Sequence, residues 1–435
     1  MQKSKITLME EPITYRKRIA DKLLSEQLEA SGAVLIQGPK WCGKTTTAEQ
    51  QAGSIIYMDE PKNRQANLIL AETDPQVLLQ GAVPRVIDEW QLAPSLWDTV
   101  RFETSHRRSP GQFILTGSAV PPDLSEQTHS GIGRIARLTM RTMSLWESGE
   151  SNGSVRLESM FSGEFVPASA ENMSLESLAF LICRGGWPGS LDLSRKAALR
   201  QALNYADAVC ESDISRVDDV CRDADFARRL MRSYARHQGQ QVPLSTIYAD
   251  LSGNRAGSMT EDTIASYLRA LRKIFVIEDL PAWNPNLRSK TAIRTSDTRY
   301  FADPSIAAAS VGTGPEDLLA DLNTLGLFFE TMAVRDLRVY AEALDGKLYH
   351  YRDKTGLECD AVIHLRNGRY GLIEIKLGGD TLIESGARTL LKLAGKIDTE
   401  AMSAPSFLMV LTGTGQYAYR RSDGVCVVPI SCLRV

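Results

Sequence analysis

The chain has 435 residues, of which 43% are apolar and 24% charged, and its formal net charge is -3. This length predicts about three domains, the composition is typical of a globular protein, and the charge gives no overall basic signature for nucleic acid. No apolar run approaches the ~20 residues of a membrane helix, and the first residues lead into polar sequence rather than the apolar core of a signal peptide. The lack of such a run predicts no membrane contact. Seven scattered cysteines without a C-x-x-C pair predict reduced thiols in a cytoplasmic protein, with no disulfide framework and no zinc site.

An amphipathic helix is predicted over residues 15–31, ahead of the first strand. Tyr15, Arg16 and Arg18 stand at its start. We interpret them as a solvated helix end. The alternative is that they border a nucleotide base.

A glycine loop then follows the apolar run of residues 33–36 and matches the phosphate-loop pattern G-x-x-x-x-G-K-[ST]. Backbone N–H groups of such a loop converge on phosphate oxygens, where the dipole of the following helix favours negative charge. In this pattern Lys44 reaches the β and γ phosphates of ATP, and the Thr45 hydroxyl binds Mg²⁺. The residues expected to bind nucleotide are Gly38, Pro39, Lys40, Trp41, Cys42, Gly43, Lys44, Thr45 and Thr46.

Two carboxylates follow a short apolar strand farther along the chain, as Asp88 and Glu89 after Val86 and Ile87. In open α/β sheets, ligands bind at the carboxyl ends of the strands. Asp88 is therefore expected to assist the Mg²⁺ ion, and Glu89 to orient and deprotonate the attacking water.

Another predicted strand, residues 112–115, runs into Thr116, Gly117 and Ser118. Thr116 and Ser118 are both candidates for contact with the γ phosphate or the attacking water. The alternative for each is that it caps the following turn.

These three motifs in this order resemble the ATPases of the AAA+ class. The runs at residues 131–134 and 143–149 resemble a narrower prokaryotic family, in which an AAA-type ATPase is fused to a C-terminal domain of unknown function (number 4143). The resemblance implies that Arg134 acts as an arginine finger, in cis or from a neighbouring subunit of a homo-oligomer. A structural salt bridge is the alternative for Arg134, and Arg137 is the second candidate for the finger.

Residues 150–170 are rich in Ser, Gly and Glu and are interpreted as a surface loop or linker. The turn at residues 184–189 resembles the family's turn between the ATPase core and a helical lid, with Trp187 packed inside. Relatives place an arginine where this chain has Ser212, so a sensor arginine is not carried over, and Arg216 is the local substitute.

Residues 241–305 show a winged helix-turn-helix pattern, which the family also leads us to expect. Thr260 is predicted to cap a helix whose first turn carries Glu261 and Asp262. Recognition helices read bases mainly from this turn, where acids repel phosphate, so we favour packing or protein contact over base reading. Backbone contact with DNA or RNA remains open for the basic residues of the presumed wing, which are Arg288, Lys290, Arg294 and Arg299.

The C-terminal part carries Glu374 and Lys376, which face the same side of one predicted strand because they are two residues apart. Together with Asp360 and the helical Glu330, they resemble the Asp…Glu-x-Lys site of the restriction-endonuclease-like fold. That resemblance implies that Asp360 and Glu374 bind Mg²⁺, that Glu330 completes the shell and that Lys376 positions the water. Three interpretations stay open: an active nuclease, a nuclease-like fold kept for nucleic-acid or partner binding, and a solvated strand face.

We therefore expect an α/β protein with a P-loop NTPase domain of AAA+ type (residues 1–150), a linker and helical lid (151–240), a winged helix-turn-helix (241–305) and a restriction-endonuclease-like α/β domain (306–435). The predicted activity is Mg²⁺-dependent hydrolysis of ATP to ADP that moves the lid and the C-terminal domains. The alternatives are a nucleotide-dependent switch for a protein partner and a metal-dependent nuclease.

Overall fold

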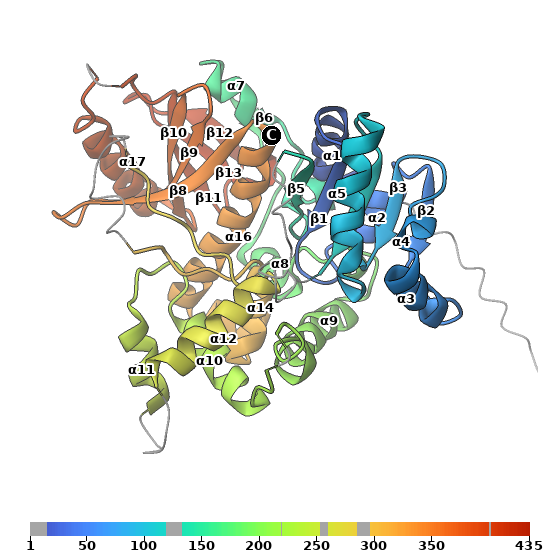
Figure 1. Ribbon diagram of the computed structural model, residues 1–435. Coiled ribbons are helices and arrows are strands. Elements are labelled where there is room, and N and C mark those ends of the chain that lie inside the picture. The colour runs from blue at the N-terminus through green and yellow to red at the C-terminus, as the bar shows by residue number, and fades with distance from the viewer. Residues whose placement is uncertain (1–14, 119–132, 219, 253–259, 285–295, 400–401) are drawn as a thin grey trace, which may run out of the picture.

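The computed structural model describes residues 15–118, 133–218, 220–252, 260–284, 296–399 and 402–435. Figure 1 shows two sheets on opposite sides of the molecule, with a group of helices below and between them. The N-terminal sheet and its helices are drawn in blue and cyan, and the C-terminal sheet in orange and red. The helices from the middle of the chain, in green and yellow, contact both.

The N-terminal sheet has five parallel strands in the order β2-β3-β4-β1-β5. In the register of the sheet, Gln37 lies opposite Gly117 and Thr139. The carboxyl ends of the strands therefore meet at one edge, where the expected site lies. The strands are β1 (Ala33–Gln37), β2 (Ser54–Tyr57), β3 (Arg85–Asp88), β4 (Phe113–Gly117) and β5 (Ile135–Thr139).

Helices cover both faces of this sheet. Alternate residues of β1 point to different cores, since Leu35 belongs to one apolar cluster and Val34 and Ile36 to another. A strand buried on both faces in this way is apolar along its length, which explains the run that precedes the loop. The helices are α1 (Ile19–Ala30), α2 (Lys44–Glu49), α3 (Arg64–Thr73), α4 (Pro75–Leu78), the short η1 (Trp90–Leu92) and α5 (Ser95–Arg107).

Residues 150–170 differ from the linker that the sequence predicts. They form β6 (Val155–Arg156), α7 (Leu157–Phe161) and β7 (Ala168–Ser169) after the one-turn α6 (Leu145–Ser148). β6 pairs with β14 (Leu433–Arg434), and β7 pairs with β12 (Tyr417–Arg420). The segment is part of the C-terminal domain because its partners lie near the end of the chain, a pairing that composition cannot reveal.

The middle of the chain is helical. Thr260 caps its helix as expected, with the Thr263 N–H donating to Thr260 Oγ1 at 3.2 Å. Where a winged helix-turn-helix would carry strands after that helix, the described residues form single bridges, Ile277 with Phe301 and Leu280 with Thr298. The elements are α8 (Leu175–Arg184), η2 (Pro188–Ser190), α9 (Arg195–Ala208), η3 (Val209–Asp213), α10 (Ala224–Arg236), α11 (Leu244–Ser252), α12 (Glu261–Lys273), α14 (Pro304–Val311) and α15 (Pro315–Ala320).

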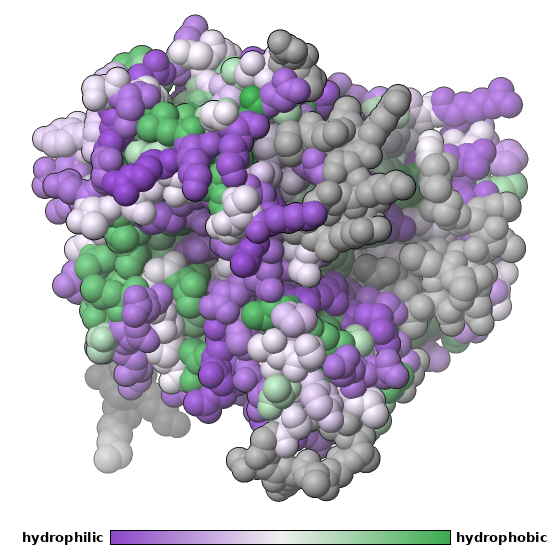
Figure 2. Space-filling view, turned by 90° about the vertical axis from the view of Figure 1, so that its left-hand side faces the viewer, coloured by the Kyte–Doolittle hydropathy of each residue, from purple (hydrophilic) through white to green (hydrophobic). Residues whose placement is uncertain are grey.

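The C-terminal sheet is mixed, with seven strands in the order β7-β12-β13-β11-β10-β9-β8. The long helix α16 (Leu322–Ala343) packs on one face, and α17 (Asp380–Ala394) packs on the other. Figure 2 looks onto the side that carries α17 and β8 and shows hydrophilic residues over most of it, with apolar residues in separate groups. The remaining elements are β8 (Gly346–Arg352), β9 (Glu358–Leu365), β10 (Tyr370–Lys376), β11 (Phe407–Thr412), β13 (Cys426–Pro429) and η4 (Ile430–Cys432).

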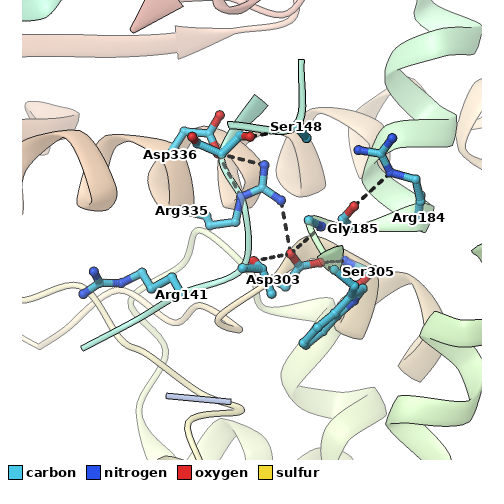
Figure 3. Close-up of polar contacts among 12 residues, drawn as sticks. Arg141, Ser148, Arg184, Gly185, Asp303, Ser305, Arg335 and Asp336 are labelled. Carbon is cyan, nitrogen blue, oxygen red and sulfur yellow. Dashed lines mark hydrogen bonds and ion pairs between the residues drawn. The ribbon is translucent and has the colours of Figure 1, made fainter. Parts of the chain in front are cut away.

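A buried polar junction, which we define as Asp303, Arg335 and Asp336 with their partners, joins the parts of the molecule (Figure 3). The Arg335 guanidinium lies between the two carboxylates, at 3.1 Å from Asp303 and 2.7 Å from Asp336. All three side chains are at most 2% exposed.

The junction also contacts the segment after β5 and the turn after α8. The Thr142 hydroxyl and the Gly186 N–H donate to Asp303, at 2.6 and 3.0 Å, and the Leu145 N–H donates to Asp336 at 2.9 Å. Four segments that are distant in sequence therefore share one set of buried charges.

Within the described residues, no helix is both long enough and apolar enough to span a membrane.

Candidate functional site

The phosphate loop connects β1 to α2 and is shaped by two glycines. Gly38 has φ 153° and Gly43 has φ 99°, conformations that residues with a β-carbon rarely adopt. A β-carbon on Gly38 would also overlap the main-chain carbonyl of Met140. The loop is therefore held tightly against the end of β5, and the first N–H groups of α2 face its hollow.

Lys44 is buried and is held by the loop itself. Its ammonium donates to the carbonyl oxygens of Gly38 at 3.1 Å and Pro39 at 2.8 Å. These are neutral partners, so the positive charge of Lys44 is not cancelled by an adjacent carboxylate. Thr46 is exposed in the first turn of α2.

Asp88, at the carboxyl end of β3, is the point where the three expected motifs meet. Its Oδ1 accepts hydrogen bonds from the Thr45 hydroxyl at 2.7 Å and from the Thr116 hydroxyl. The structure thus brings the loop, the acidic pair and the third motif together, as the sequence predicts. Thr116 binds Asp88, and Ser118 is buried just beyond the end of β4.

Glu89 directly follows β3 and has a left-handed backbone, with φ 54°. Its N–H donates to Thr116 Oγ1 at 3.4 Å, and its carboxylate accepts a hydrogen bond from the Gln91 amide. Burial raises the pKa of the Glu89 carboxyl, and the charge of Lys44 opposes that rise. A base with a raised pKa accepts a proton more readily at neutral pH.

The side chains of the loop also contact the helical part. Lys40 pairs with Asp213 of η3 at 2.5 Å. Trp41, 49% exposed, lies edge-on to Tyr205 at 5.5 Å between ring centroids, and Tyr205 lies on Trp187 at 4.3 Å. The packed Trp187 agrees with the sequence prediction, whereas nothing local in the sequence signals Asp213 or Tyr205 as partners of the loop.

Arg18 contradicts the interpretation of residues 15–18 as a solvated helix end. Its side chain is 3% exposed and pairs with the buried Glu147 at 3.0 Å. It also donates to the carbonyl of Cys42 at 2.8 Å, so it supports the loop from behind. Cys42 is itself buried. Arg18 and Glu147 lie far apart in the sequence, so the spacing of residues along the chain does not predict this ion pair.

Arg134 lies at the other edge of the sheet. It precedes Ile135, which is opposite Ala33 at the amino ends of β5 and β1, about 13 Å along the strand from the carboxyl edge. This corrects the expectation that Arg134 acts in cis, because it does not reach the loop of its own chain. A role at the site of a neighbouring subunit stays a prediction. Arg137 is exposed, with its guanidinium 6.0 Å from the Trp97 ring centroid.

The basic residues expected to contact nucleic acid are only partly described. Arg288, Lys290 and Arg294 lie outside the described residues. Arg299 pairs with Asp279 at 3.1 Å and is 14% exposed. Its charge is therefore used inside the protein.

The C-terminal part brings Glu330, Asp360, Glu374 and Lys376 together, as the sequence predicts, but in a different form. The Lys376 ammonium lies 2.9 Å from Asp360 and 2.7 Å from Glu374, and the Ile375 N–H donates to Asp360 at 2.7 Å.

Glu330 accepts a hydrogen bond from the Tyr300 hydroxyl. Burial and the Asp360 charge raise the pKa of Glu330 to about 8 and that of Glu374 to about 8. Among the described residues, no three His, Cys, Asp or Glu side chains are grouped as metal ligands. In this arrangement Lys376 lies between Asp360 and Glu374, and a metal shell of Glu330, Asp360 and Glu374 stays a prediction.

Three families match the chain. Residues 30–148 match an AAA domain, residues 175–317 match a domain of unknown function (DUF8612), and residues 325–433 match a domain of unknown function (DUF4143). The chain therefore carries an AAA domain in its N-terminal part and a DUF4143 domain in its C-terminal part. This confirms both halves of the resemblance that the motifs carried.

Two mycobacterial proteins, uncharacterized proteins of Mycobacterium bovis and Mycobacterium tuberculosis, are each 23% identical over 417 residues, which is 95% of this chain and 83% of theirs. Among solved structures, the chain is similar to the Walker-type ATPase PABY2304 of Pyrococcus abyssi, with 15% identity, a TM-score of 0.40, and coverage of 68% of this chain and 96% of that one. It is also similar to the Aeropyrum pernix ORC1 protein in complex with DNA, with 14% identity, a TM-score of 0.26, and coverage of 72% and 95%. These TM-scores are too low to assign details of this fold.

Proposed function

We propose that this protein binds ATP and Mg²⁺ at residues 38–46 and hydrolyses the bond between the β and γ phosphates of ATP. The observation that carries the proposal is the contact of Thr45 and Thr116 with Asp88, between a buried Lys44 and a partly buried Glu89. In this arrangement Lys44 and the first N–H groups of α2 offer donors for phosphate. Thr45 and Asp88 offer oxygen ligands, and Glu89 offers a base. The AAA domain match at residues 30–148 supports it.

The residues present fit a magnesium ion. Mg²⁺ prefers oxygen ligands, keeps several waters and is bound by one or two protein groups together with phosphate. The Thr45 hydroxyl and the Asp88 carboxylate, 2.7 Å apart, are such groups. The ion would neutralise charge on the phosphate oxygens.

The chain's own residues supply the remaining steps. Lys44 holds the phosphate by its charge, and the N–H groups of α2 orient it. Glu89 accepts the proton of the attacking water, since burial raises the pKa of its carboxyl and so makes its carboxylate a better proton acceptor. Thr116 fixes Asp88 and the Glu89 backbone relative to each other.

Hydrolysis is proposed to move the helical part and the C-terminal domain. The ion pair of Lys40 with Asp213 and the contact of Trp41 with Tyr205 join the loop to that part. The buried junction at Asp303 and Arg335 extends the connection to α16.

A second candidate is a nucleotide-dependent switch for a protein partner. It is favoured by the same ion pair of Lys40 with Asp213, because occupancy of the loop by phosphate competes for the Lys40 charge whether or not ATP is hydrolysed.

Substitution Glu89→Gln tests the proposal in the full-length protein. We expect ATP to bind with unchanged affinity and phosphate release to fall by about 100-fold or more, as for removal of a general base. The exposed Glu72→Gln on α3 is the matched control and should hydrolyse ATP like the wild type.

Two results would count against the proposal. A wild type that binds ATP without releasing phosphate would favour the switch. Hydrolysis by Glu89→Gln at the wild-type rate would show that another group is the base.

A further inference from the structure

We propose that Gln91 is a positioning residue that holds the Glu89 carboxylate in place for hydrolysis, and that Gly117 is a glycine because the Gln91 amide occupies the space of a side chain there. This inference rests on the proposed ATP hydrolysis. Neither Gln91 nor Gly117 stands among the residues that the motifs assign to the site.

The first observation is the hydrogen bond from the Gln91 amide nitrogen to Glu89 Oε2. Gln91 lies in η1, the short 3₁₀ turn that follows Glu89. Bound at one carboxylate oxygen, Glu89 keeps a single rotamer and presents its other oxygen, Oε1, to a proton donor. A base must lie within hydrogen-bond reach of the proton it removes, so fixing its position matters as much as its basicity.

The second observation comes from the other wall of the site. A β-carbon on Gly117 would lie 2.7 Å from Gln91 Oε1, closer than real β-carbons approach such atoms. No positive φ is recorded for Gly117, so its backbone conformation does not require glycine. The requirement at this position is space, and the Gln91 amide takes most of it, with Trp90 Nε1 next at 3.1 Å from such a β-carbon.

The third observation separates this role from a structural one. Gln91 Oε1 is buried and accepts no hydrogen bond from the part of the chain that the structure describes. Leaving a buried amide oxygen unpaired costs free energy, so this placement is poor if its purpose is to stabilise the turn. It is explained if the amide nitrogen serves Glu89.

The test is steady-state hydrolysis of Mg–ATP by the full-length protein with substitution Gln91→Met. Methionine fills a similar volume and lacks the N–H donor. We expect kcat to fall about 10-fold, while KM and the affinity for ATP stay within about twofold. The exposed Gln76→Met is the control for the chemical change and should leave kcat unaltered.

Two double substitutions test whether the loss of kcat in the single variants arises through Gln91 and Glu89. Gly117→Ala should lower kcat about 10-fold in the wild type and clearly less beside Gln91→Ala, where only the contact with Trp90 Nε1 at 3.1 Å remains. Gln91→Met should likewise add little beside Glu89→Gln, because its effect passes through Glu89.

An unchanged or increased kcat for Gln91→Met would overturn the inference while leaving the proposed function intact. Equal losses in kcat and ATP affinity, or additive effects of Gln91→Ala and Gly117→Ala, would also overturn it, because they indicate a structural role. A wild type without ATP hydrolysis would overturn the proposed function and this inference together.

Discussion

Two lysines, the buried Lys44 and the partly buried Lys376, are arranged in opposite ways. In the phosphate loop, Lys44 donates to carbonyl oxygens of the backbone, and Asp88 is held by the hydroxyls of Thr45 and Thr116. In the C-terminal domain, Lys376 donates directly to Asp360 and Glu374.

The difference lies in whether the charges are already compensated. Neutral partners orient Lys44 and Asp88 without cancelling them, so the first site retains a positive charge for phosphate and a negative one for a cation. Lys376 already binds the oxygens of Asp360 and Glu374. An ion that enters the second site would therefore have to displace the Lys376 ammonium. The same residue types therefore predict binding at the first site and a closed cluster at the second.

The largest expected effect is on ATP binding. Lys44→Ala should weaken ATP binding by about 100-fold or more, because a buried charge that holds phosphate is lost. Lys376→Ala should leave ATP affinity unchanged. Calorimetric titration with Mg–ATP measures both, and the exposed Lys62→Ala on the surface beyond β2 is the control. Equal weakening by Lys44→Ala and Lys376→Ala would show that the two sites are one functional unit.

A smaller effect concerns stability and pH. The pKa of Glu330 is about 8 in the folded protein against an ordinary value of 4.5, so its bound proton stabilises the fold fully below 4.5 and this contribution is lost as pH rises through about 8. We expect the free energy of unfolding to fall by about 2 kcal/mol from pH 6 to pH 9. Glu330→Gln should reduce that fall, as measured by urea denaturation at both pH values.

The matched control for this prediction is Glu358→Gln, which removes an exposed carboxylate from β9 of the C-terminal sheet. It should keep the wild-type dependence on pH. A Glu330→Gln variant with the same dependence as the wild type would show that the proton is bound elsewhere.

The smallest expected effect is on nucleic acid. Because Lys376 already contacts both Asp360 and Glu374, we expect no cleavage of single- or double-stranded DNA or RNA in the presence of Mg²⁺ or Mn²⁺. Gel analysis of end-labelled substrates measures this. Cleavage by the wild type that is absent in Lys376→Ala would contradict the comparison and make the C-terminal cluster an active nuclease.

The sequence predicts the phosphate site well because its parts are local. The phosphate loop, Asp88 and Thr116 each stand at the carboxyl end of an apolar strand, and parallel strands bring these ends to one edge. The partners of the loop from other regions, such as Arg18 and Asp213, follow from tertiary packing and have no spacing to reveal them. Gln91 is an intermediate case, since it stands two residues from Glu89 but its role depends on the space left by Gly117.

The fold shows the same division. The strands β1, β3 and β4 follow from apolar runs in the sequence, whereas β6 and β7 have two residues each and owe their existence to β14 and β12. A strand of two residues is too short to show the alternation of apolar and polar residues from which strands are predicted. The sequence also does not predict the ion pair of Lys376 with Glu374. The strand pattern places both residues on one side of the strand, but it does not show that they bind each other.

The pairing of β6 and β7 with the end of the chain has a consequence for how the protein is made. During synthesis, residues 155–169 leave the ribosome long before the strands that they join, so the C-terminal sheet is completed only when the last residues arrive. A gene fragment encoding residues 325–433 alone would lack β7 of the seven-stranded sheet and the β6 partner of β14, and would leave the edge of β12 open to pairing with other molecules. Recombination should therefore exchange these domains together rather than singly.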